Sequence, residues 1–404
     1  MTAELGTQRL RRRLRRAVVK NLARASMLLT HPARMAVVYG HPDFEENSLV
    51  TALRLSEVYP GETVLVCRDP ARTADYLAVV ALTVGGRPAA IRLQRLDKWQ
   101  VLRLFGRAEL VFTTHGLFFS PASIGRRLHV NLWHGTGPKS SANHNFASVF
   151  PDDALSSASP AWGADTARTL GTLEPVTVLP GNARADLLVT SVRIRAALGW
   201  ADGRPVVLWL PTYRQSNEVA VGSLHEGRSV RHQGAELAAI AERHGVRLII
   251  KLHPFDAESF DHPGVEVLAT ADLWAAGVAF GQALASSAAV ISDYSSAWVD
   301  AMAAGVPVGL YCPDLADYDR DRGFNAPPMA EIAADLLLGQ AADLDEFFAA
   351  VAAGTPFRPS AQAACSHALG LVRGPRCDAM LRAAGALGAE RKGDDFGLRP
   401  QTPV

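Results

Sequence analysis

Short runs of β-branched and other apolar residues alternate with longer segments of helical pattern along most of this chain of 404 residues. Such alternation is typical of α/β domains whose sheets are mainly parallel. The runs expected to form strands are 35–39, 63–67, 89–93, 109–113 and 130–133 in the first half, and 206–210, 246–251, 265–268, 289–292 and 308–311 in the second. Helices are expected at 48–58, 234–243 and 296–304. The pattern therefore predicts two α/β units.

The segment from 187 to 204 is expected to connect the two units, because it is charged and ends in a polar turn at 200–205. We therefore place one domain at 31–190 and another at 191–385. A separate helix is expected in residues 1–30 and a flexible, polar tail in 386–404. Further helices are expected at 328–339, 343–352 and 361–385. With 48% hydrophobic and 20% charged residues, each half can bury a core of its own.

The first 24 residues carry eight basic side chains against the single acid Glu4, a net charge of +7, so that the rest of the chain carries −6. Leu10, Leu14, Val18 and Leu22 recur every four residues and would form one apolar stripe on a helix. A basic amphipathic helix of this kind can lie in the headgroup region of an anionic membrane. A solvated basic arm and a nucleic-acid patch are the alternatives.

The rest of the composition argues against export and against a metal or disulfide framework. The stretch that follows the basic segment is too short and too polar for the core of a signal peptide, and no stretch predicts a membrane span. The four cysteines contain no close pair, which disfavours both disulfides and a zinc knuckle. A reducing, cytoplasmic setting is expected.

Two groups of polar residues follow expected strands. The turn from Trp133 to Lys139 contains His134, a base near neutral pH, Gly135 and Thr136 in a flexible backbone, and the fixed charge of Lys139. Thr212 and Arg214 follow the expected strand at 206–210, and His253 follows the expected strand at 246–251. The guanidinium of an arginine such as Arg214 can bind a phosphate through two hydrogen bonds. Taken singly, these residues could equally be hydrogen-bonded strand ends or surface ion pairs.

A third group opens an expected helix. Asp293, Ser295 and Ser296 follow the strand at 289–292, and Asp300 lies one turn into the helix. Free backbone amides and hydroxyls at such a helix start can bind a phosphate oxygen. Asp300 is expected either to order the Ser296 hydroxyl or to bind a ligand hydroxyl. A plain serine N-cap without a ligand is the alternative.

Together and in this order, these segments resemble the CDP-glycerol glycerophosphotransferase family of teichoic acid synthesis. Its W-H-G-T-P-x-K, P-T-x-R, H-P and D-Y-S-S-x-x-x-D motifs match segments that begin at Trp133, Pro211, His253 and Asp293. The G-x-P and Y-x-x-D-x-x-x-Y-x-x-x-R-G-F motifs match 305–307 and 311–324. The proline of the first motif is displaced by one position, and the family's G-x-P-R-x-D has become 181–186 with alanine in place of proline.

The resemblance implies a GT-B-like fold, with two Rossmann-like domains whose parallel sheets face a central cleft. It also implies a CDP-glycerol or related CDP-alditol donor and a lipid-linked glycan or polyol-phosphate acceptor, in an enzyme peripheral on the inner face of the membrane. His134 would act as general base. His253, Arg214 and the start of the helix at Ser295 and Ser296 would hold the pyrophosphate of the donor and stabilise the departing CMP. No cofactor, no obligatory metal and no nucleic-acid partner is expected.

Two rival functions remain possible at this stage. The same fold serves glycosyltransferases that use a sugar nucleotide, and an inactive membrane-associated scaffold could retain it. The adjacent acids Asp152 and Asp153, and Asp394 and Asp395, are expected to be solvated surface pairs, because neighbouring side chains of an extended chain point in opposite directions.

Overall fold

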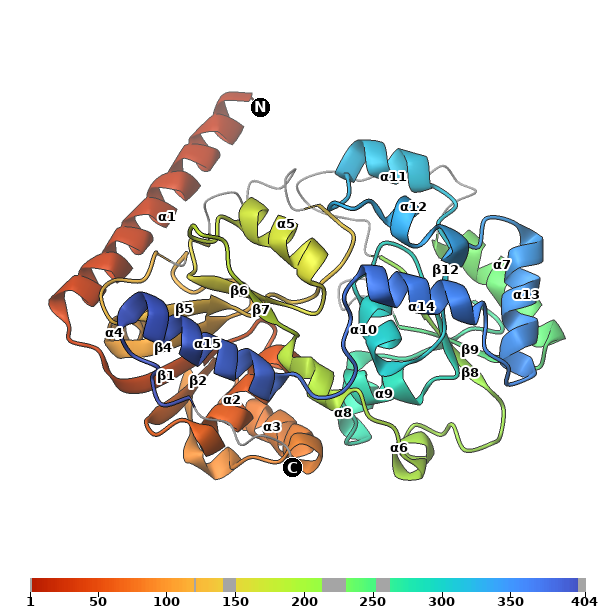
Figure 1. The fold of residues 1–404 in the computed structure, drawn as a ribbon, viewed down its shortest axis with the longest axis horizontal. Coiled ribbons are helices and arrows are strands. Elements are labelled where there is room, and N and C mark those ends of the chain that lie inside the picture. The colour runs from red at the N-terminus through yellow and green to blue at the C-terminus, as the bar shows by residue number, and fades with distance from the viewer. Residues whose placement is uncertain (1, 120, 141–149, 213–229, 252–261, 399–404) are drawn as a thin grey trace.

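The computed structural model describes residues 2–119, 121–140, 150–212, 230–251 and 262–398. The chain forms two α/β domains side by side (Figure 1), each built on a wholly parallel sheet, of seven strands in the first domain and five in the second. The fold class expected from the sequence is confirmed.

The strands of the first sheet run in the order β3-β2-β1-β4-β5-β6-β7, and those of the second in the order β10-β9-β8-β11-β12. Their bounds are β1 Ala33–Tyr39, β2 Glu62–Cys67, β3 Ile91–Arg95, β4 Ala108–Thr113, β5 Leu128–Asn131, β6 Ala154–Ser157, β7 Val178–Pro180, β8 Val206–Leu210, β9 Arg247–Ile250, β10 Glu266–Val267, β11 Ala289–Ser292 and β12 Val308–Leu310. All ten expected strands are present within two residues. The short strands β6 and β7 were not expected, because serine and proline dilute their apolar pattern.

The α-helices cover both faces of the sheets (Figure 1). Their bounds are α1 Thr2–Leu29, α2 Glu46–Val58, α3 Pro70–Val84, α4 Lys98–Arg107, α5 Pro160–Leu170, α6 Val192–Ala197, α7 Val230–Arg243, α8 Thr270–Ala275, α9 Phe280–Ser286, α10 Ala297–Ala304, α11 Leu315–Arg322, α12 Met329–Ile332, α13 Ala341–Ala352, α14 Pro359–Ala368 and α15 Cys377–Lys392. The helix expected at 328–339 is only the short α12 followed by a 3₁₀ turn. The helix expected at 361–385 is interrupted, since Gly370 and Gly374 adopt positive φ between α14 and α15.

The end of the chain returns to the first domain. Met380, Leu381 and Phe396 are fully buried in the same core as β1, α2 and α3. This corrects the expected boundary at 385 and the expected flexible tail, because the apolar face of α15 is buried against the first sheet rather than the second. Residues 386–398 are consequently ordered, and Asp186 accepts hydrogen bonds from the amides of Arg376 and Cys377 at the start of α15 (2.6 and 3.0 Å).

Among the residues of α1 whose side chains are described, those of its second half attach the helix to the first domain. Ala23 and Met27 are buried against β1 and α4, whereas the first turns of the helix project away from the domain (Figure 1). Leu14, Val18 and Leu22 of the expected stripe are 58%, 57% and 44% exposed, and the side chain of Leu10 lies outside the described residues. The helix therefore has one packed face and one exposed apolar face.

The two acid pairs are not solvated surface pairs. Asp153 is buried, accepts a hydrogen bond from the amide of His129 at 2.8 Å and pairs with Lys392 at 2.9 Å. Burial raises the pKa of its buried neighbour Asp152 to about 7. Asp394 is half-buried and pairs with Arg126, and Asp395 accepts a hydrogen bond from the amide of Gly397 at 2.8 Å. Packing of α15 on β5 and β7 encloses the first pair, which local spacing could not reveal.

Candidate active site

Each sheet has a point at which the strand order reverses, between β1 and β4 in the first and between β8 and β11 in the second. Ligands of open parallel sheets bind outside the carboxyl ends of the strands at such a point, because the connections there leave in opposite directions. The residues expected to carry chemistry lie at these two places.

At the second switch point, Thr212 follows β8 and Asp293 follows β11. The carboxylate of Asp293 accepts hydrogen bonds from the amide of Thr212 at 2.9 and 3.0 Å, from its hydroxyl at 2.6 Å, and from the amide of Ser295 at 3.2 Å. Both residues are buried. Asp293 therefore holds two strand ends and the serine turn in one arrangement.

Helix α10 begins immediately after this turn. Ser296 occupies the N-cap position, and its hydroxyl makes no capping hydrogen bond within the described structure. The Ser295 hydroxyl accepts a long hydrogen bond from the amide of Ala297 at 3.4 Å. The plain serine cap considered as an alternative is thus not formed by Ser296, and its hydroxyl lies at the positive end of the helix dipole.

The His134 loop meets this helix start across the two domains. A Cβ atom added to Gly135 would lie 2.3 Å from the Ser296 hydroxyl oxygen, and one added to Gly137 would lie 2.9 Å from the Ser296 Cβ. Only glycine permits so close an approach of the backbone. The two segments expected to form the site are therefore in contact, although Gly135 and Ser296 are 161 positions apart in the sequence.

Trp133, which precedes His134, has a φ of +48°. A non-glycine residue in this region costs on the order of 1–3 kcal/mol and persists only where its surroundings enforce it. Here the Trp133 amide donates to the side chain of Asn131 at 2.9 Å, and its carbonyl accepts from the side chain of Asn47 at 3.2 Å. The backbone that leads into the exposed His134 is thus held from both sides.

Arg184 joins the loop to α10. Its guanidinium donates to the His134 carbonyl at 2.7 Å and pairs with the Asp300 carboxylate at 2.5 Å. Burial raises the pKa of Asp300, and the guanidinium opposes that effect. Burial alone would lower the pKa of Arg184, but the carboxylates of Asp300, Glu45 and Glu46 outweigh it and raise the value. Asp300 thus fixes an arginine, a partner that the sequence did not suggest.

The remaining residues of the loop anchor it. The buried Thr136 hydroxyl accepts a hydrogen bond from the amide of Ala158 and contacts the Ser157 hydroxyl, both at 2.9 Å. Lys139 forms an antiparallel bridge with Phe324 of the second domain. These contacts give Thr136 a structural role. Arg214 and His253, expected in the donor site, lie outside the described residues.

Asn47 and Arg184 were not among the site residues expected from the sequence. Two histidines that follow β1 and β4, His41 and His115, were not expected either. Asn47 accepts a hydrogen bond from the Arg184 amide at 3.0 Å in addition to its contact with Trp133. A signal existed for Arg184, which lies in the segment matching G-x-P-R-x-D. No local pattern marks the others, whose importance depends on which strands are neighbours.

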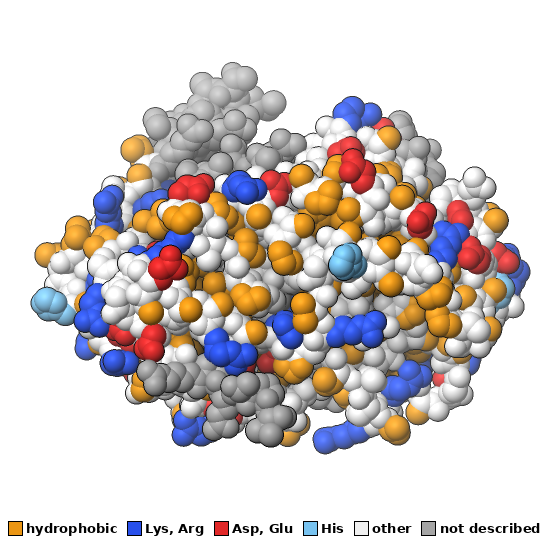
Figure 2. All heavy atoms as spheres, viewed as in Figure 1, with side chains coloured by type: hydrophobic (Ala, Val, Ile, Leu, Met, Phe, Trp, Pro, Cys, Tyr) orange, Lys and Arg blue, Asp and Glu red, His pale blue; other side chains and the backbone are white. Residues whose placement is uncertain are grey.

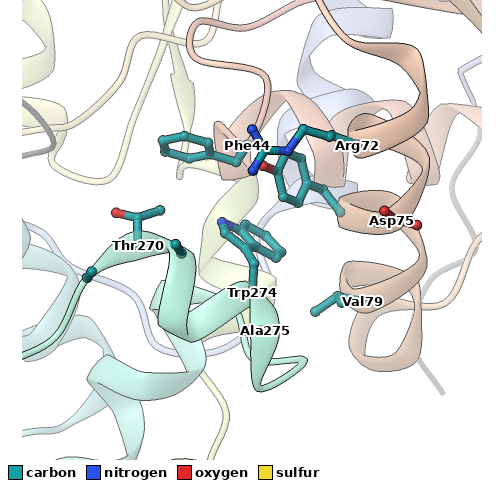
Figure 3. A pocket seen from close by; sticks show the side chains of 10 residues that line it. Phe44, Arg72, Asp75, Val79, Thr270, Trp274 and Ala275 are labelled. Atoms are coloured by element: carbon teal, nitrogen blue, oxygen red, sulfur yellow. The ribbon is translucent and has the colours of Figure 1, made fainter.

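A cavity of about 500 Å³ lies further along the domain interface, between α3 and α8. Arg72, Asp75, Tyr76 and Val79 line it from one face of α3, since they are spaced by three and four residues. In Figure 3 the side chains of Arg72 and Trp274 extend from α3 and α8 into the space between these helices, with Thr270 on the α8 side. The Tyr76 ring contacts those of Phe44 and Trp274, at centroid distances of 6.0 and 4.6 Å. The cavity is adjacent to the carboxyl end of β9, where Lys251 lies 3.3 Å from the Thr270 hydroxyl.

Within the described ranges, no group of three or more His, Cys, Asp or Glu side chains is arranged to hold a metal ion. In the same part of the chain, no helix is long and apolar enough to cross a bilayer. Both acidic and basic side chains are present on the face shown in Figure 2.

The comparisons with known proteins agree with this architecture. The wall teichoic acid polymerase TagF, as a histidine-to-asparagine variant soaked with CDPG, superimposes with a TM-score of 0.65 at 15% identity, over 96% of this chain and 98% of that chain. A histidine-to-alanine variant of TagF superimposes with a TM-score of 0.63 at 15% identity, over 95% of this chain and 97% of that chain. No curated protein matches the sequence significantly.

At such identity the structural similarity establishes the fold. The family assignment rests on the sequence itself. Residues 88–355, about two thirds of the chain, match the profile of the family described as CDP-glycerol:poly(glycerophosphate) glycerophosphotransferase. That range contains the His134 loop, the Asp293 turn and α10. The chain therefore belongs to the CDP-glycerol:poly(glycerophosphate) glycerophosphotransferase family.

Proposed function

We propose that this protein transfers glycerol phosphate, or a related alditol phosphate, from a CDP-alditol to a hydroxyl of a lipid-linked glycan or teichoic-acid-type acceptor and releases CMP. The observation that carries the proposal is the contact between the His134 loop and the start of α10 at Ser296, across the domain interface. Membership of the family supports the donor class.

In the proposed reaction the acceptor oxygen attacks the phosphorus that bears the alditol. The bond to the bridging oxygen breaks, and CMP leaves with that oxygen. His134 takes the acceptor proton. The amides at the start of α10, with the hydroxyls of Ser295 and Ser296, would hold the pyrophosphate oxygens. Positioning and charge neutralisation dominate phosphoryl transfer, so little covalent chemistry is asked of the protein.

Arg214 and His253 complete the proposal as residues that bind the donor and stabilise departing CMP. We further propose that the cavity beside Trp274 receives the nucleoside. It lies near the carboxyl ends of β9 and β10, which are two and three strand spacings, or about 9 and 14 Å, from β11. Its aromatic side chains offer a flat surface on which a base can stack.

The central experiment compares His134→Ala with the unchanged protein. Turnover, measured as CMP released with acceptor present, should fall by about 10²- to 10⁴-fold if His134 is the base. Affinity for CDP-glycerol, measured by calorimetry, should stay nearly the same. CMP release at the original rate would refute the role. Trp274→Ala should show the opposite pattern, with weakened donor binding as the main effect, and an unchanged donor affinity would remove the cavity from the proposal.

The rival functions are separated by a thermal-shift panel. A donor that binds the folded state raises the melting temperature by mass action. CDP-alditols should stabilise the protein more than UDP-sugars do. Preference for a UDP-sugar would favour a glycosyltransferase, and no response to any nucleotide would favour a scaffold. Turnover that survives a chelating agent would support the proposed independence from a resident metal.

We also propose that α1 brings the enzyme to the inner face of the cell membrane. The exposed Leu14, Val18 and Leu22 lie within an arc of about 80° on the helix, since successive residues are about 100° apart. The packed Ala23 and Met27 lie on a different face. An exposed apolar stripe on a strongly basic helix suits an anionic lipid surface.

A further inference from the structure

Three histidines lie at the carboxyl ends of three neighbouring strands of the first sheet. In the register of the sheet, Tyr39 of β1 is opposite Thr113 of β4, which is opposite Asn131 of β5. His41 and His115 each follow their strand by two residues, and His134 follows by three. The order of the strands thus places three imidazoles close to the first switch point.

The rings of His115 and His134 are stacked. Their centroids are 4.6 Å apart and their planes differ by only 9°. Trp133 contacts the His134 ring at a centroid distance of 4.1 Å. His134 is exposed, and both of these neighbouring rings restrict the rotation of its imidazole.

His115 is itself held in place. Its Nδ1 lies 2.9 Å from the hydroxyl of the buried Thr114, which also accepts a hydrogen bond from the His41 amide at 3.3 Å. The His41 ring meets that of His115 edge-on, with centroids 6.0 Å apart. The pKa of His115 is lowered to about 4, mainly because burial of the ring disfavours its charged form and also because a positive charge on the nearby His41 would repel it. An uncharged His115 can stack on His134 without charge repulsion.

We propose that His115 is a positioning residue, which fixes the ring of His134 by stacking so that its nitrogen faces the acceptor hydroxyl. The inference rests on the proposed role of His134 as the base. It assigns no proton transfer to His115 itself. A misplaced reacting group can cost about 100-fold in rate, so that an imidazole on a solvent-exposed loop gains from a fixed neighbour.

The test uses the full chain and two substitutions of His115. His115→Ala removes the stacked ring and should lower kcat by about 10- to 100-fold with little change in the KM for the donor. His115→Phe keeps a flat ring and should restore most of kcat. His367→Ala, an exposed histidine on α14, is the matched control and should leave kcat unchanged. Melting temperatures of all variants establish that they are folded.

A wild-type kcat for His115→Ala would overturn the inference. Equal losses for the alanine and phenylalanine variants would also overturn it, because the imidazole itself and not the stack would then be needed. The substitutions are repeated in His134→Ala, where removal of His115 should have no further effect. If His134→Ala retains turnover, the proposed function falls; if it loses turnover while His115→Ala does not, only the inference about His115 falls.

Discussion

At the scale of single residues, buried polar groups at the domain interface carry the strongest physical signal. Glu46, at the start of α2, is buried and accepts hydrogen bonds from the amides of Phe280 and Gly281 at 2.6 and 3.3 Å. Burial raises its pKa from 4.5 to about 7, against the opposing effect of Arg184 and of these amides. Glu46 therefore binds a proton more tightly in the folded state than in the unfolded chain.

This shift predicts a pH dependence of stability. Below pH 4.5 Glu46 is protonated in both the folded and the unfolded state, and its contribution to the free energy of unfolding is fully present. As the pH rises to about 7, Glu46 ionises in the unfolded chain before it ionises in the folded protein, so that this stabilising contribution is lost. Glu46→Gln removes the titration, so its free energy of unfolding relative to the unchanged protein should rise between pH 5 and 8, by up to ~3 kcal/mol. Urea unfolding of both proteins at pH 5 and at pH 8 measures this difference in the free energy of unfolding. Glu331→Gln, at an exposed position, is the control, and an equal pH response of both variants would contradict the assignment.

At the scale of elements, α1 and α15 show how far a helix's environment decides its role. The packed face of α1 covers the first sheet, while its other apolar stripe has no covering element among the described residues. Residues that face solvent in this way are available for a lipid surface. The opposite holds for α15, whose apolar face is buried in the first domain.

Vesicle sedimentation checks the role of α1. Replacing Leu14, Val18 and Leu22 together by serine should reduce binding to vesicles that contain phosphatidylglycerol by at least about 10-fold, because less apolar surface can be buried. The control replaces Leu82, Val192 and Val372, which are also exposed and lie elsewhere, by serine. Binding that survives the first replacement but is abolished by salt would indicate a purely electrostatic basic arm. Equal loss in both variants would also argue against the helix.

At the scale of the whole molecule, the ion pair between Arg184 and Asp300 connects the two domains. The side chains are 16% and 9% exposed, so that removal of one charge leaves the other poorly solvated. Asp300→Asn should therefore destabilise the protein by ~3 kcal/mol. It should also lower turnover, since the same guanidinium holds the His134 carbonyl.

A double-mutant cycle tests this coupling. Arg184→Met combined with Asp300→Leu removes both charges and should recover much of the lost stability, measured by urea unfolding, because no unpaired charge is buried. Turnover should stay low, because the hydrogen bond to the His134 loop is still missing. Stability changes that simply add would show that the pair does not couple the domains.

The sequence was sufficient for the fold class, the family and ten strands, because periodicity and motif spacing are local properties. It also predicted site residues in the segments of His134, Ser296 and Asp300, which the structure brings together. It was not sufficient for the partner of Asp300, for the return of α15 to the first domain, or for the burial of Asp152 and Asp153. Each of these depends on contacts between distant segments.

The amino-acid sequence alone thus determined ten of the twelve strands of the described residues and the segments that carry polar chemistry at their ends. Only the tertiary structure decided that β1, β4 and β5 are neighbours and that His41, His115 and His134 therefore meet. It likewise decided that the glycines of the His134 loop lie against Ser296. The physical reason is that strand order and domain packing are set by the burial of whole apolar faces, which no spacing along the chain records.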